Sequence, residues 1–160
     1  MSSKAEIVSE TSNAVSNPLD VVPDEMPFDV PYGSPISLDQ AQTVIHAAMA
    51  EAKKRNWKMN VAVVDCGGSL VAFQRMDGAM LASILIAQHK ARAAATFRRP
   101  TKVFEDGIQL MHLNYLLAFD GIIASRGGIP LIDHGVIIAQ SVVQEAPIPR
   151  TKSSAMQERQ

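Results

Sequence analysis

Several residues that could do chemistry lie at the two ends of one predicted β-hairpin. The segment Asn60–Ala79 joins two apolar, β-branched runs through the turn CGGS, where paired glycines tolerate positive φ angles. Asp65, just before the turn, is expected to accept hydrogen bonds from its backbone amides. Arg75 and Asp77 follow at the other end and lie on the same side of a regular strand. Such a pair can line a pocket, but a surface ion pair has the same pattern.

A predicted helix and a second glycine turn supply further candidates. His89 lies in the helix, and a neutral imidazole there can bind iron, although a lone helix histidine can equally be an ordinary surface or core residue. Arg126 precedes the turn at Gly127 and Gly128, and its guanidinium is a candidate for contacting an anion. Free backbone amides in the two glycine turns would suit a carboxylate or propionate group, which predicts a shared anion pocket.

The composition limits the classes of protein to consider. A chain of 160 residues with 47% hydrophobic residues can form one domain with a real core. The formal net charge of −1 argues against nucleic acid as a partner. A single cysteine excludes an internal disulfide and a four-cysteine zinc site, and no two histidines have a metal-ligand spacing. The first residues lack the apolar stretch of a secretory signal, and no run is long enough to cross a membrane, so we expect a cytoplasmic protein.

Three regions are predicted along the chain. Residues 1–34 are expected to form a disordered or extended tail, because prolines recur at four-residue intervals from Pro23. Residues 35–138 form the folded domain, and Ser37 with Gln40 predicts a capping box at its first helix. Helices are predicted to end near residues 56, 97 and 109, and strands are predicted over 61–65, 70–76, 121–125, 129–132 and 136–138. This order predicts an α/β fold of the α+β type, an antiparallel sheet flanked by helices.

Four ordered motifs carry a resemblance to a known family. The sequences VAVVDCGGSLVAFQRMDGA, ASILIAQHKARAAATFRRPT and ASRGGIPLI contain V-V-D-x-G-G-x-L, R-M-D-G-A, K-A-x-x-A-x-x-F and G-G-x-P in order. Over about Ile36 to Ile138 the chain resembles the GlcG/HbpS-like family, which includes a glycolate-utilisation protein, a haem-binding protein and the C-terminal domain of some corrinoid adenosyltransferases. The resemblance implies a profilin-like fold, frequent homo-oligomers, and haem (heme) or corrinoid binding in several members. It also implies a cofactor or anion contact for Lys90, which opens the K-A motif.

The leading functional hypothesis is a small oligomeric protein that binds haem or a related tetrapyrrole, with neither nucleic acid nor a membrane as a partner. The candidate cofactor-binding residues are His89, Lys90, Arg75, Asp77, Arg126, Gly127 and Gly128. The alternative is an enzyme or accessory factor in the catabolism of small organic acids, in which Lys90 and Arg126 hold a carboxylate and Asp65 or Asp77 moves a proton. A pure scaffold is a third hypothesis. The residues leave the question of catalysis open and favour a binding protein.

The end of the chain departs from the family pattern. Residues 139–160 are polar and lack periodicity, where family members continue with a further strand and an alanine-rich helix. We hypothesise a single-base slip near the codon for Ala139, because a permitted back-translation read one base earlier encodes GTIGCSGGTDSQDEVVCNAGAA, which follows the family ending. If the printed tail is native, the sheet lacks its last strand and an edge is exposed. Resequencing the gene tests this hypothesis.

Overall fold

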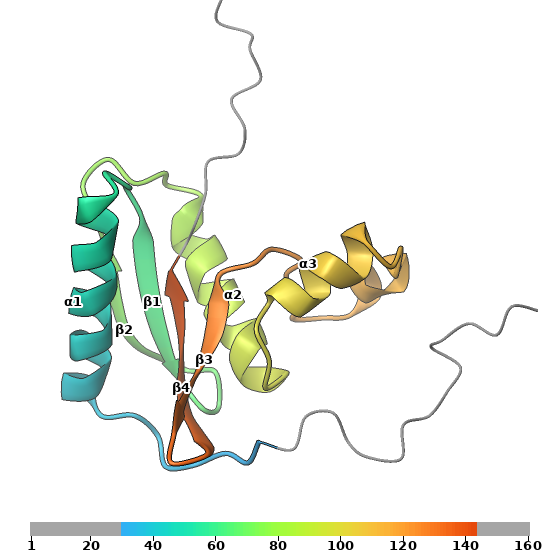
Figure 1. Ribbon diagram of the computed structural model, residues 1–160, viewed down its shortest axis with the longest axis horizontal. Helices are drawn as coiled ribbons and strands as arrows, with labels where there is room; N and C mark the ends of the chain where they lie inside the picture. The colour runs from blue at the N-terminus through green and yellow to red at the C-terminus, as the bar shows by residue number, and fades with distance from the viewer. Residues whose placement is uncertain (1–29, 144–160) are drawn as a thin grey trace, which may run out of the picture.

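The computed structural model describes residues 30–143, in which one helix is followed by two strands, three helices and two further strands (Figure 1). The segments predicted as tails fall mostly outside this range, at residues 1–29 and 144–160. The elements are α1 (Leu38–Lys54), β1 (Asn60–Asp65), β2 (Leu70–Arg75), α2 (Ser83–Thr96), α3 (Lys102–Gln109), the 3-10 helix η2 (Asn114–Ala118), β3 (Gly128–Asp133) and β4 (Val136–Val143).

Four antiparallel strands form one sheet in the order β2-β1-β4-β3. The sheet and its flanking helices confirm the predicted fold class. β1 is central and its first five residues are buried, which is the environment that its β-branched run favours. A tight turn at His134 and Gly135 joins β3 to β4, and both residues have positive φ.

α1 covers one face of the sheet, over β1 and β2. The predicted capping box is confirmed: the Gln40 backbone N–H donates to Ser37 Oγ, and the Ser37 N–H donates to Gln40 Oε1. Ala41 and Ile45 pack with Val61 and Val63 in the core on this side. The helix therefore begins where the sequence predicts, and it buries an apolar stripe at helical spacing.

α2 covers the opposite face, over β1, β4 and β3. Its buried stripe, with Ala87, Ala91 and Ala95 at four-residue intervals, packs against Ala62 and Val64 of β1. Methyl side chains allow the helix backbone to approach the sheet closely. This close approach explains the alanine-rich sequence, and it brings the neighbouring turns into contact with the helix.

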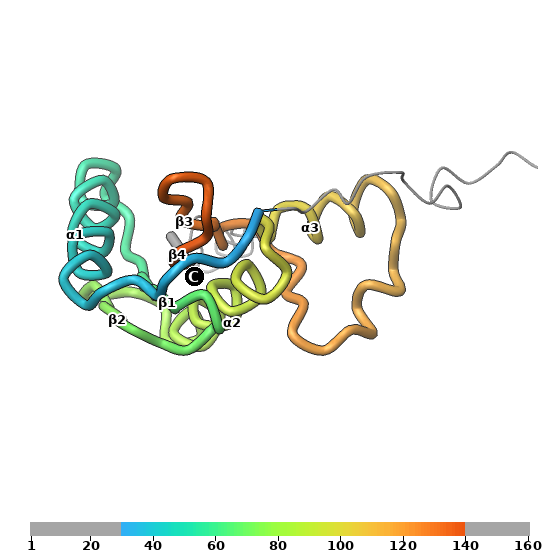
Figure 2. Tube along the Cα trace, turned by 90° about the horizontal axis from the view of Figure 1, so that it is seen from below, coloured from blue at the N-terminus to red at the C-terminus, as the bar shows by residue number. Residues whose placement is uncertain are grey.

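The segment 102–124, which we call the arm, projects from one side of the sheet (Figures 1 and 2). It contains α3 and η2, which pack on each other. The predicted strand over 121–125 is wrong, because this segment is the irregular return path of the arm and joins no strand ladder of the described sheet. Its Ser125 carbonyl instead accepts a hydrogen bond from the Thr101 hydroxyl at 2.7 Å.

Two element limits differ from the predictions. β4 continues to Val143, five residues beyond the predicted end at Ile138, and it pairs with β1 on one side and β3 on the other. Residues 30–34 also belong to the folded part: Tyr32 bridges to Ile137, and its hydroxyl donates to the Ala95 carbonyl at 2.9 Å. The edges of the described sheet are therefore β2 and β3.

No helix within residues 30–143 has the length and apolarity needed to cross a membrane.

Candidate functional site

The β1–β2 turn is closed by Asp65. Its Oδ1 accepts hydrogen bonds from the Gly67 and Ser69 amides, both at 2.9 Å, as the sequence predicts. The Gly68 amide donates to the Asp65 carbonyl at 3.0 Å. These amides are thus occupied within the turn, so they are not available to an anion, contrary to the predicted anion pocket.

The second glycine turn is held by the distant Thr101. Gly128 N–H donates to Thr101 Oγ1 at 3.0 Å, and Thr101 N–H donates to the Gly128 carbonyl at 3.0 Å. The Thr101 hydroxyl donates in turn to Ser125 O, so this fully buried threonine ties both ends of the arm to each other. We call the contacts among Thr101, Ser125 and Gly128 the clasp. Gly127, beside it, has a φ of 120°, which favours glycine.

Both glycine turns pack directly on α2. A Cβ at Gly128 would lie 2.5 Å from the Lys90 carbonyl oxygen, and one at Gly68 would lie 3.1 Å from Arg92 Cγ. Gly68 also has a φ of 84°, so a side chain there is strained as well as crowded. These glycines are therefore required by the close packing of α2.

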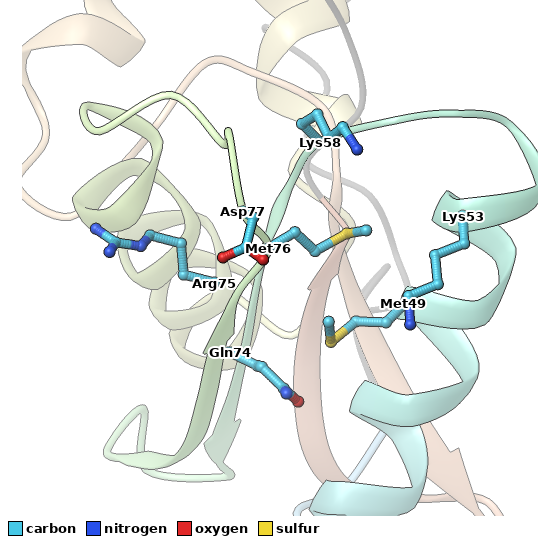
Figure 3. Close-up of a pocket in the computed structure, with 7 residues that line it drawn as sticks. All are labelled: Met49, Lys53, Lys58, Gln74, Arg75, Met76 and Asp77. Carbon is cyan, nitrogen blue, oxygen red and sulfur yellow. The ribbon is translucent and has the colours of Figure 1, made fainter.

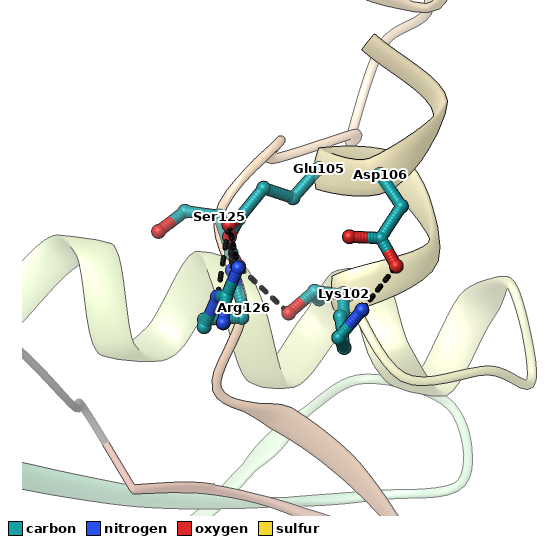
Figure 4. A network of polar contacts seen from close by, with 6 residues as sticks. Lys102, Glu105, Asp106, Ser125 and Arg126 are labelled. Carbon is teal, nitrogen blue, oxygen red and sulfur yellow. Dashed lines mark hydrogen bonds and ion pairs between the residues drawn. The ribbon is translucent and has the colours of Figure 1, made fainter. Parts of the chain in front are cut away.

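Arg126 is bound to Glu105 of α3 (Figure 4). The Arg126 Nε donates to Glu105 Oε1 at 2.8 Å, and the Arg126 backbone amide donates to Oε2 at 2.6 Å. These hydrogen bonds hold the pKa of the Glu105 carboxyl below its ordinary value. Lys102 pairs with Asp106 on the same helix. Arg126 thus joins the two ends of the arm, next to the clasp.

Lys90 is 1% exposed, on the face of α2 that is turned toward the protein interior. Burial lowers the pKa of its ammonium, and the negative charge of Glu105 opposes this effect. Within residues 30–143 the ammonium makes no hydrogen bond or ion pair. Lys90 therefore offers little surface to a ligand in this conformation, and Lys90 and Arg126 do not form one open anion site.

His89, by contrast, is exposed and borders a cavity of about 280 Å³. We call this hollow the α2 cavity; it is lined by His89, Arg92, Gly121, Ile122 and Ile123. His89 and Arg92 also line a smaller adjoining hollow against the β1–β2 turn. The Arg92 Nε donates to the Gly68 carbonyl at 3.3 Å, which fixes the base of the guanidinium beside the cavity.

Arg75 and Asp77 lie elsewhere, at a cleft between α1 and the end of β2 (Figure 3). This cleft has a volume of about 320 Å³ and shares no lining residue with the α2 cavity. The two residues form no ion pair with each other among residues 30–143. The structure therefore separates the predicted site residues into four places. His89 lies at the exposed surface of α2 and Lys90 on its buried face, Arg126 with Gly127 and Gly128 lies at the Glu105 contact and the clasp, and Arg75 with Asp77 lies at this cleft.

Sequence reasoning identified His89 and missed the other four residues that line the α2 cavity. Arg92 follows His89 by one helical turn, and the i,i+3 spacing signals that the two side chains are neighbours. Ile122 and Ile123 were assigned to a strand by their β-branched pattern, which cannot distinguish a strand from an apolar return segment.

The family assignment rests on comparison with known sequences. The family model described as "Haem degrading protein HbpS-like" matches residues 36–144. The chain belongs to this HbpS-like family. Protein GlcG of Escherichia coli is 37% identical over 103 residues, which are 64% of this chain and 76% of that protein. An uncharacterized 15.0 kDa protein from the dhaT-dhaS intergenic region of Citrobacter freundii is 33% identical over 106 residues, covering 64% and 75% of the two chains.

Solved structures share the fold. The crystal structure of HbpS is 27% identical with a TM-score of 0.65, covering 77% of this chain and 86% of that one. Klebsiella pneumoniae protein ORFY is 26% identical with a TM-score of 0.63, covering 79% and 86%. The structure of a PduOC–haem complex is 23% identical with a TM-score of 0.62, covering 71% and 85%, and this likeness concerns the fold alone.

Proposed function

We propose that this protein binds haem or a closely related tetrapyrrole at the α2 cavity, with His89 as the iron ligand. The proposal is supported by membership of a family described as haem-degrading and HbpS-like. The observation that carries it in this chain is the exposed His89 imidazole beside a cavity with an apolar wall and a guanidinium.

The residues of the α2 cavity fit the chemistry of haem. A neutral imidazole coordinates haem iron through a ring nitrogen, and the His89 side chain is accessible from solvent. Ile122 and Ile123 offer an apolar surface for the porphyrin ring. Arg92 can pair with a propionate, because its planar guanidinium binds carboxylates through two parallel hydrogen bonds. Bound haem would supply iron-centred redox and ligand-binding chemistry, while these side chains orient the macrocycle and limit its contact with water.

The size of the cavity indicates partial enclosure. At about 280 Å³ it is slightly smaller than the usual range for small-molecule sites, roughly 300–1,000 Å³. Part of a tetrapyrrole would therefore extend beyond it. A second subunit of the predicted homo-oligomer could cover the part of the tetrapyrrole that extends beyond the cavity.

We also propose that the arm contacts another copy of the chain. Large apolar side chains are exposed along it: Val103, Leu110, Met111, Tyr115, Leu117 and Phe119. A patch of this kind on a soluble protein indicates an interaction surface. Light scattering tests this proposal. The double variant Leu110→Gln/Leu117→Gln should have a lower molar mass in solution than the wild type, while Leu38→Gln, on the exposed face of α1, should not. Equal masses for the wild type, the double variant and the Leu38→Gln control would refute an arm contact.

Titration with hemin tests the haem proposal. The wild-type protein should give a saturable Soret band, and His89→Ala should shift that band and weaken binding by at least about tenfold, since about 1.4 kcal/mol corresponds to a tenfold change. His46→Ala is the matched control, because His46 is also an exposed helix histidine but lies on α1. A Soret band that is identical in both variants would refute the role of His89, and unchanged hemin spectra with the wild type would refute the function.

The alternative function, an enzyme or accessory factor for small organic acids, stays a prediction. Its expected carboxylate contacts are Lys90, which is buried, and Arg126, which is hydrogen-bonded to Glu105. We therefore do not base a proposed catalytic site on these two residues.

A further inference from the structure

A second cavity lies on the other side of the sheet from α2. It is the cleft of about 320 Å³ between α1 and the end of β2, which we call the α1 cleft. The last turns of α1 contribute Met49 and Lys53, the loop before β1 contributes Lys58, and the end of β2 contributes Gln74 and Met76. Segments distant in sequence thus meet here, and no part of the haem proposal uses them.

The charges at the α1 cleft are unbalanced. Lys53 and Lys58 make no hydrogen bond or ion pair with any part of the chain that the structure describes. The neighbouring basic residues do have partners: Lys54 and Arg55 both pair with Glu51. Lys53 and Lys58 therefore border the cleft as uncompensated ammonium groups, although the whole chain has a net charge of −1.

One acid belongs to the same cleft. Asp77 lines it but forms no ion pair with Lys53, Lys58 or Arg75 within residues 30–143. Figure 3 shows the Arg75 side chain turned away from Met49 and Lys53, so the positive charge facing the cleft comes from the two lysines. Asp77 reduces this charge without removing it. The cleft therefore favours a ligand with a single, compact negative group.

The floor of the α1 cleft is apolar. Met76 is 8% exposed and packs in the core with α1, and Met49 is half-buried against the same cluster. Figure 3 shows both thioether side chains between the helix and the strand. Methionine is flexible and polarisable, so it adapts to small apolar groups of varied shape. Gln74 adds an amide that can donate to an oxygen or accept from a hydroxyl.

We propose that the α1 cleft binds a small organic carboxylate with a short apolar body. The carboxylate contacts Lys53 and Lys58, whose flexible stems let the ammonium groups turn toward it. The aliphatic part lies on Met49 and Met76. Inorganic phosphate could satisfy the lysines but would leave the thioether floor uncovered, so the cleft should discriminate between the two anions.

Nuclear magnetic resonance titration with sodium butyrate tests this site. Butyrate should cause saturable shifts in the amide signals of residues 53–58 and 74–77. Lys53→Gln and Lys58→Gln should each raise the apparent Kd for butyrate about tenfold, in line with the loss of a charged hydrogen bond of roughly 1.5 kcal/mol or more. Lys54→Gln is the matched control, because it changes an adjacent lysine that is already paired with Glu51.

Several outcomes would overturn the proposal. Absence of saturable shifts in these segments, or equal weakening by Lys53→Gln and Lys54→Gln, would exclude a site built by the unpaired lysines. Inorganic phosphate binding as tightly as butyrate would contradict the role of the methionine floor. All three substitutions are at exposed positions, and circular dichroism melting confirms that each variant is folded. Because haem binding is measured at the α2 cavity, either proposal can fail without the other.

Discussion

The clasp at Thr101 should contribute strongly to stability, and Thr101→Val tests it. Valine keeps the shape of the side chain but removes the hydroxyl, so no cavity forms. The hydroxyl accepts from Gly128 N–H at 3.0 Å and donates to Ser125 O at 2.7 Å, and Thr101 is fully buried. The substitution therefore leaves two backbone groups without a partner.

The magnitude follows from the burial of these groups. A buried group that loses its partner costs about 1–3 kcal/mol. Gly128 is buried, so its amide pays this cost, whereas the half-buried Ser125 carbonyl can recover part of its bond from water. The free energy of unfolding should thus fall by about 2–4 kcal/mol. For a domain of this size the melting temperature should fall by roughly 8–15 °C.

Urea unfolding and calorimetry measure both quantities. Thr43→Val is the control, because the Thr43 hydroxyl is exposed and bonds only to the Asp39 carbonyl, so its loss should change stability by less than about 0.5 kcal/mol. The clasp also anchors the return segment that carries Ile122 and Ile123, so Thr101→Val should weaken hemin binding. A destabilisation below about 1 kcal/mol, similar to that of Thr43→Val, would show that this reasoning is wrong.

Three further substitutions test the surroundings of the clasp. Gly128→Ala should destabilise the fold severely, because the new Cβ would lie 2.5 Å from the Lys90 carbonyl oxygen; a variant with wild-type melting would contradict the close contact. Lys90→Met should raise stability by about 1 kcal/mol or more at neutral pH, since it removes a buried ammonium, and the gain should shrink as the pH rises toward 10.5, where the wild-type lysine loses its charge in the unfolded chain as well. Glu105 has a lowered pKa, so its pairing with Arg126 stabilises the fold fully above the ordinary value of 4.5 and is lost as the pH falls through the lower, folded-state value. The free energy of unfolding, measured with urea at pH 6 and again below pH 4.5, should therefore fall less in the Glu105→Gln variant than in the wild type. An equal fall in both proteins would exclude this linkage.

Local patterns in the sequence predicted most of the fold. The capping box at Ser37 and the glycine hairpin closed by Asp65 depend on residues close together in the chain, and both agree with the structure. The failure at residues 121–125 has the opposite cause. There an apolar, β-branched run is held by the distant Thr101, and no local pattern reports that contact.

The candidate site was predictable only in part. His89 was identified by its chemistry, and its neighbour Arg92 could have been found from helical spacing. The environments of Lys90 and Arg126 depend on tertiary structure. Lys90 faces the interior of the protein, and Arg126 forms hydrogen bonds with Glu105 at the base of the arm. The α1 cleft likewise needs segments from α1 and β2, and only the fold brings them together.

The central claim is that haem binds with its iron on His89, and a crystal structure of the hemin-loaded protein tests it most directly. An anomalous difference map recorded at the iron absorption edge locates the metal independently of the porphyrin density. The account predicts one strong peak bonded to a ring nitrogen of His89, with the macrocycle over Ile122 and Ile123 and a propionate near Arg92. An iron peak elsewhere, at the α1 cleft or at another histidine, would contradict it.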